Sequence, residues 1–207
     1  MRPFILTSIL LVCCLGASAQ RLISLGVTGG VPFTPFFTDQ TFTPLVLNPF
    51  SAFPYSVHSY SGLNEYLVGP TIEVLLPSNF SVEADALFRP LKLKQQKYVI
   101  SSPAPLTSTT NYSSWEIPLL LKYRASSGLI RPFFEAGPNF RAVANPIGSL
   151  LSKAGVSAGA GINVKIWHVF IAPQVRLTHW GKDRGGAVLN YVASERNQGE
   201  FLVGFTF

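Results

Sequence analysis

The sequence predicts an all-β fold, an eight-stranded antiparallel up-and-down transmembrane β-barrel, from its composition, its lack of an apolar helix and its alternating polarity. Hydrophobic residues make up 47% of the 207 residues and charged residues 13%, about half the charged share of a typical soluble domain. Beyond the N-terminus, no run of roughly 18 apolar residues offers a spanning helix. Few charges with 16 Phe and 17 Gly exclude a disordered chain, a coiled coil and a charge-rich helical bundle.

The N-terminus is predicted to be a secretory signal peptide of 19 residues, which leaves one barrel domain in residues 20–207. Arg2 supplies the positive charge, residues 4–15 form the apolar core, and Ala17 and Ala19 mark the small-residue cleavage site. Both cysteines lie in the removed segment. The mature chain is therefore expected to have no disulfide, thiolate metal site or cysteine nucleophile.

The rest of the chain alternates between apolar and polar residues in segments of roughly ten, which is typical of membrane-crossing strands. Long and short connections between these segments also alternate, as they do in outer-membrane barrels with short periplasmic turns. With both termini in the periplasm, the long connections 32–64, 92–113 and 181–198 would face outward. The eight predicted strands cover residues 21–31, 65–76, 80–91, 114–124, 130–142, 154–166, 169–180 and 199–207.

The charged residues of these strands all fall on one phase of the alternation, together with glycine, serine, threonine and asparagine. The other phase carries bulky apolar side chains. A soluble lipocalin-like barrel would point the apolar phase inward, but bulky side chains would crowd a narrow eight-stranded lumen. We therefore expect the apolar phase to face lipid, with aromatic girdles at its ends. The lumen would then hold Glu73, Glu83, Asp85, Arg89, Glu116, Lys122, Arg124, Arg131, Glu135, Arg141, Lys165, Arg176 and Glu200.

These lumen charges are nearly balanced, with six acids and seven bases. A pore selective for one sign of ion would carry a ring of one charge, whereas balanced charges can pair and fill the lumen. The sequence therefore favours an ion-pair network. A conducting path is one alternative, and acid–base catalysis by Glu83 and Asp85, which point the same way, is another.

Several segments carry a family resemblance. They are residues 115–124, 133–140, 159–164 and 175–180, with the C-terminal Gly-Phe-Thr-Phe. The chain resembles the outer-membrane β-barrel domain family that includes PorT-like proteins, and more distantly the OmpA and OmpX barrels. The resemblance implies a porin-like barrel in the envelope of a Gram-negative bacterium. It also implies that Phe205 and Phe207 are the signal read by the barrel assembly machinery.

The histidines give no indication of a metal site, and no cofactor is expected. His58, His168 and His179 share no metal-ligand spacing. Outer-membrane lipid deacylases pair a histidine with a serine on the barrel wall, and no serine follows His179 two residues on. We expect His179 to be an interfacial residue beside Trp180, and the chain not to be an enzyme.

The first long connection, 32–64, is rich in aromatic residues and carries one charge, Asp39. Its prolines are expected to prevent regular strand extension. A connection of this kind is a binding surface for a protein or an apolar ligand, a plug over the barrel mouth, or a segment lying on the outer leaflet. The structural roles are favoured over binding.

The remaining outer segments are basic, which favours contact with anionic lipid phosphates. A nucleic-acid partner does not fit an exported protein. The sequence thus predicts a monomeric, non-enzymatic protein of the cell outer membrane, with an envelope-structural or surface-binding role through its loops. Lipopolysaccharide and the barrel assembly machinery are the expected partners, and a narrow pore or small-solute transporter is the alternative function. The basic residues are Lys92, Lys94, Lys97, Lys153, Lys182, Arg184 and Arg196.

Overall fold

The structure is a computed structural model of the chain. It describes residues 22–43, 55–62, 65–99, 104–125, 128–144, 150–166, 168–183 and 192–207. The predicted cleavage residues Ala17 and Ala19 lie outside these ranges. Within the described part of the chain, no helix is long and apolar enough to cross a membrane.

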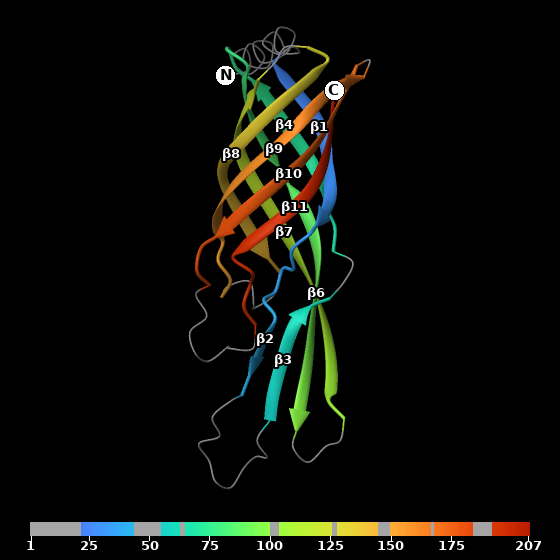
Figure 1. Ribbon diagram of the computed structural model, residues 1–207, viewed down its shortest axis with the longest axis vertical. Helices are drawn as coiled ribbons and strands as arrows, with labels where there is room; N and C mark the ends of the chain where they lie inside the picture. The colour runs from blue at the N-terminus through green and yellow to red at the C-terminus, as the bar shows by residue number, and fades with distance from the viewer. Residues whose placement is uncertain are drawn as a thin grey trace, which may run out of the picture.

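Eight strands close into an antiparallel barrel (Figure 1). Around the barrel they are β1 (Ile23–Pro32), β4 (Leu67–Leu75), β5 (Phe80–Asp85) continued by β6 (Leu87–Val99), β7 (Leu106–Arg124), β8 (Ile130–Val143), β9 (Ala154–Ile166), β10 (Val169–Trp180) and β11 (Asn197–Thr206). β1 pairs with both β4 and β11, so the sheet has no free edge there. The eight-stranded antiparallel up-and-down barrel predicted from the sequence is confirmed.

β5 and β6 act as one strand of the barrel. Both pair with β4 and β7, and the register does not change between them. The short break falls at Ala86, whose N–H donates to the carbonyl of Pro70 on the facing β4, while Pro70 has no N–H to donate in return. A missing ladder hydrogen bond therefore explains the break, and the barrel wall is continuous across it.

The two ends of the barrel differ (Figure 1). At the terminal end, β1 begins beside the end of β11, since Gly26 pairs with Thr206. The turn between β4 and β5 is also at this end, and Ser78 and Asn79 have positive φ, as the central residues of a type I′ hairpin turn require. At the opposite, distal end, β6 and β7 run on beyond the barrel.

The distal continuation forms a small sheet that the sequence did not predict. We call it the distal sheet; it consists of β2 (Gln40–Phe42), β3 (Tyr55–Ser61), Leu93–Val99 of β6 and Leu106–Thr110 of β7. The expected connection 92–113 is thus mostly strand, and connection 32–64 contains two strands despite its prolines. The expectation was wrong because β3 contains no proline and pairs with β6, whose other edge pairs with β7.

The outward face of the barrel is apolar. On β7, the outward residues from Trp115 to Tyr123 are 42–50% exposed, whereas the intervening Glu116, Leu120 and Lys122 are at most 2% exposed. The charged phase therefore lines the lumen. This is the inverse of a soluble barrel, in which the apolar phase fills the interior.

Aromatic pairs mark both ends of the apolar face. Near the distal end the rings of Phe88 and Trp115 lie 5.4 Å apart, and near the terminal end those of Phe80 and Tyr123 lie 5.0 Å apart. Trp115 and Tyr123 are eight positions apart on β7, roughly 26 Å along a strand. With a strand tilt of about 40°, this gives an apolar band of roughly 20 Å, close to the height of about 25 Å seen in membrane barrels.

Candidate functional site

The lumen is packed with charged side chains. Eleven of the thirteen residues expected there are at most 7% exposed, all of them except Arg131 and Lys165. They form two clusters, one in the middle of the barrel and one near the distal end. A buried charge is tolerated only when it is paired and hydrogen bonded, so the contacts within each cluster decide what the lumen can do.

Arg176 is the centre of the middle cluster. It extends from β10 and is fully buried. Its guanidinium lies 2.9 Å from Asp85, 2.9 Å from Glu135 and 3.4 Å from Glu83. Since β5 and β10 are four strands apart in either direction around the barrel, Arg176 joins opposite walls. Gly159 leaves room for this contact, because a Cβ there would lie 2.9 Å from the Glu135 carboxylate.

The middle cluster continues toward the terminal end. Lys122 binds Glu83 and lies 3.7 Å from Glu135. Arg124 binds Glu73, whose carboxylate also accepts a hydrogen bond from Ser81. Glu73 and Glu83 face each other across β4 and β5, so these two cations offset a repulsion between like charges.

Arg89 organises the distal cluster. Its guanidinium lies 2.6 Å from Glu65, 3.5 Å from Glu116 and 3.8 Å from Glu200, and it donates a hydrogen bond to Gln198. Sequence reasoning missed Glu65, although the residue was inside a predicted strand and on the same phase as Glu73, the lumen acid predicted in that strand. Continuing the alternation to the end of the strand would have identified it.

Two phenylalanines close the distal mouth. Phe36 and Phe37 are at most 1% exposed and pack with Leu91, Leu93 and Leu151. We call these five side chains the plug. Of the three roles left open for connection 32–64, the plug is the one that Phe36 and Phe37 adopt.

Arg141 ties the plug to the barrel wall. Its guanidinium lies 5.1 Å from the ring centroid of Phe36 and 4.3 Å from that of Trp180. It also donates hydrogen bonds to Ser152 and Ser194. Trp180 is fully buried, because it lies on the same inward phase of β10 as Arg176. His179 beside it is exposed and bonds Asn197.

Arg131 and Lys165 differ from the other predicted lumen residues. They lie at the terminal end, where both approach the ring of Phe170, at 5.6 and 5.8 Å. Neither forms an ion pair with another described residue. The buried lumen therefore holds five bases, and with Glu65 it holds seven acids. The sequence predicted nearly equal numbers of acids and bases in the lumen, whereas the structure places two more carboxylates than basic groups there.

The remaining predicted residues lie away from the lumen. Phe205 and Phe207 at the C-terminus point outward and are 44% and 68% exposed. His58 lies in the distal sheet, where it binds Asp39 at 2.6 Å. Within the described ranges, no three His, Cys, Asp or Glu side chains are grouped so as to hold a metal ion.

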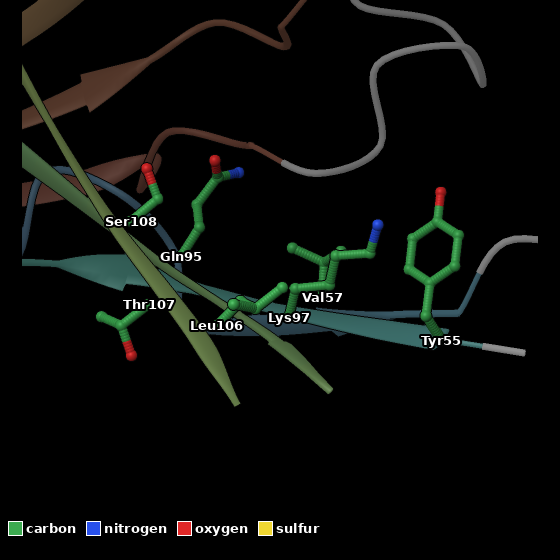
Figure 2. Close-up of a pocket in the computed structure, with 7 residues that line it drawn as sticks. All are labelled: Tyr55, Val57, Gln95, Lys97, Leu106, Thr107 and Ser108. Carbon is green, nitrogen blue, oxygen red and sulfur yellow. The ribbon is translucent and has the colours of Figure 1, made fainter. Parts of the chain in front are cut away.

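The distal sheet has an open groove on one face (Figure 2). Its volume is about 410 Å³. The ammonium of Lys97 lies 4.1 Å from the ring centroid of Tyr55. Figure 2 shows Gln95, Lys97 and Tyr55 pointing to the same side of the sheet. The groove therefore combines an aromatic ring, a cation and hydrogen-bonding groups in a water-exposed place. Its lining residues are Tyr55, Val57, Gln95, Lys97, Leu106, Thr107 and Ser108.

Comparisons with known proteins support the fold. No protein-family model matches the sequence, and no curated protein matches it. Among solved structures, the chain is similar to the outer membrane protein OprG from Pseudomonas aeruginosa, with a TM-score of 0.51 and 13% identity over 90% of this chain and 94% of that one. It is also similar to Neisserial surface protein A, with a TM-score of 0.44 and 11% identity over 89% and 95% of the two chains. The likeness to OprG shows a shared barrel fold, and membership of the PorT-like family stays a prediction.

Proposed function

We propose that this chain is a monomeric, non-enzymatic outer-membrane barrel with a closed lumen, which acts at the cell surface through its distal sheet. The apolar outward face and its aromatic borders support a membrane location, because a soluble protein rarely exposes so large an apolar surface. The terminal end would then face the periplasm and the distal sheet the outside. The predicted signal peptide fits this orientation.

The observation that carries the proposal is the closure of the lumen. Arg176 joins opposite walls in the middle of the barrel, and the plug with Arg141 fills the distal mouth. Both obstructions consist of fully buried side chains. A lumen blocked at two levels favours a structural or binding role over transport.

The groove of the distal sheet is the part of the molecule best suited to binding. The ring of Tyr55 and the aliphatic Val57 and Leu106 can contact an apolar group, while Lys97 can bind a negative charge. A ligand with an apolar part and an anionic group fits this lining. Lys97→Gln should weaken the binding of such a ligand without changing the fold or stability of the barrel.

A narrow pore is the second candidate, and the excess of two buried carboxylates favours it. Lumen acids can lower the barrier for cations, and the plug could open. Under this alternative, the small cavity of about 40 Å³ at the terminal end, which Glu73, Arg124 and Arg131 help to line, would be part of the path.

Recordings from planar bilayers separate the two candidates. The refolded parent protein should insert and show no conductance steps. A variant with Phe36→Ala and Phe37→Ala should remain closed as well, because the middle cluster is intact. Steady cation-selective conductance of the parent would overturn the closed-lumen proposal and establish the pore.

A further inference from the structure

Charged residues on the outward face are confined to one place. Along the described barrel strands and the distal sheet, the outward phase carries no Asp or Glu and only two cations of permanent charge, Lys92 and Lys94. Both lie on β6 just beyond Phe88, whose ring contacts Trp115 at the border of the apolar face. The two lysines are therefore at the level where lipid headgroups begin.

The backbone around Lys92 leaves space for its side chain. Gly62 donates a hydrogen bond to the Lys92 carbonyl at 2.6 Å. A Cβ at Gly62 would lie only 2.7 Å from the Cβ of Lys92 and 3.6 Å from its Cδ. The lysine stem thus crosses the bare backbone of Gly62, where a larger residue would displace it.

Polar neighbours extend the site. Lys92 pairs across the ladder with Asn111, and Lys94 pairs with Thr109 on one side and Tyr60 on the other. Residues two apart on one face of a strand are roughly 7 Å apart, so both ammonium groups can reach one phosphate. Asn111 and Thr109 can donate further hydrogen bonds to it.

No described carboxylate neutralises these lysines. Lys92 and Lys94 form no ion pair with another described residue. The nearest outward-side acid along the ladder is Asp39, which is bound to His58 at 2.6 Å. Glu65, the other acid in this region, points into the lumen and binds Arg89. The positive charge of the pair therefore faces the headgroup level without a protein partner.

We propose that Lys92 and Lys94, with Asn111 and Thr109, bind a phosphate group of an outer-leaflet lipid of the lipid A type. The inference rests on the proposed membrane orientation and names a lipid partner for this barrel. Lysine binds phosphate by charge-assisted hydrogen bonds. Each lysine near a membrane surface adds to the free energy of binding anionic lipid. Removing two lysines is therefore expected to weaken lipid binding roughly 30-fold.

The test measures lipid binding to the refolded, detergent-solubilised protein. The probes are bisphosphorylated lipid A, the same lipid with both phosphates removed, and inorganic phosphate, each titrated and followed by native mass spectrometry. The parent should prefer the bisphosphorylated lipid. The variant K92Q/K94Q should bind that lipid roughly 30-fold more weakly and should bind the dephosphorylated lipid as the parent does.

Matched controls keep the test specific. Lys165→Gln removes a positive charge at the terminal end of the barrel, where Lys165 lies near Phe170 and lines neither the groove nor the proposed site, so this variant should bind lipid as the parent does. Equal binding by K92Q/K94Q and the parent, or an equal loss in Lys165→Gln, would overturn the proposal. Binding of inorganic phosphate as tight as that of lipid A would also overturn it, in favour of a free-phosphate site.

A separate measurement distinguishes failure of the proposed membrane location from failure of the lysine site. Insertion into phosphatidylcholine vesicles, followed by protection of the barrel from added protease, tests the proposed membrane location in the absence of lipid A. Failure of the parent to insert would refute the proposed function. Normal insertion of K92Q/K94Q together with unchanged lipid A binding would refute the lysine site alone.

Discussion

Replacing Arg176 with glutamine should destabilise the barrel strongly. The guanidinium is fully buried and within 3.4 Å of three carboxylates, Glu83, Asp85 and Glu135. Its removal raises the excess of buried carboxylates from two to three. Losing one partner of a buried ion pair typically costs about 3–5 kcal/mol. We expect a loss near 3 kcal/mol, because Lys122 still contacts Glu83 and Glu135.

The assay is a denaturant titration of the barrel refolded into lipid vesicles, with the free energy of unfolding taken from the midpoint and slope. Arg131→Gln is the matched control, since Arg131 is half-buried and forms no ion pair with another described residue. That variant should lose less than about 1 kcal/mol. Combining Arg176→Gln with Asp85→Asn should recover part of the loss, because the carboxylate left alone is then neutral.

The reasoning would be refuted by a specific result. If Arg176→Gln is as stable as Arg131→Gln, the carboxylates around Arg176 are solvated and the middle of the lumen is a hydrated channel. The double variant would then show no recovery. In that case the parent should conduct ions, and the pore would replace the closed barrel.

Three further predictions concern export, the membrane face and the plug. Mass spectrometry of the membrane-extracted protein should find a chain that starts at Gln20; a lipidated cysteine in the leader would contradict cleavage after Ala19. Leu119→Lys, halfway between the aromatic borders and 45% exposed, should cost roughly 2–4 kcal/mol of folding free energy in vesicles. The same lysine at Leu106, outside the barrel, should cost close to nothing, and equal costs would disprove the position of the apolar face. Phe36→Ala should cost about 3–5 kcal/mol in the same titration, and an unchanged midpoint would show that the plug does not hold Phe36.

The barrel strands could be predicted because each has apolar side chains on its outward face and polar side chains on its lumen face. Wherever one face of a strand forms the apolar outer surface and the other faces the polar lumen, apolar and polar residues alternate along it, as from Trp115 to Tyr123. The same strand begins at Leu106 with Leu-Thr-Ser-Thr-Thr-Asn, where both faces are polar and no alternation is left to detect. The distal half of β7 was missed for this reason.

Contacts between segments that are distant in the sequence are the second reason why parts of the structure could not be predicted. β3 forms by pairing with residues of β6 more than thirty positions further along the chain, and local residue preferences do not contain that information. Trp180 ends a predicted strand on the same phase as Arg176, so the alternation alone indicates that its side chain points inward. Its partner Arg141 is on another strand, so the stacking that holds the indole inside could not be read locally.

The position of Arg176 has a mechanical consequence. Backbone hydrogen bonds fix the circumference of a barrel, but a ring of fixed circumference can still flatten into an ellipse under lateral pressure. Contacts between neighbouring strands resist this deformation poorly, because such strands keep their spacing as the ring flattens. Arg176 on β10 reaches Asp85 on the diametrically opposite β5, and so fixes a diameter. In the membrane location proposed above, this contact across the lumen would resist a change in the cross-section of the barrel when bilayer tension changes.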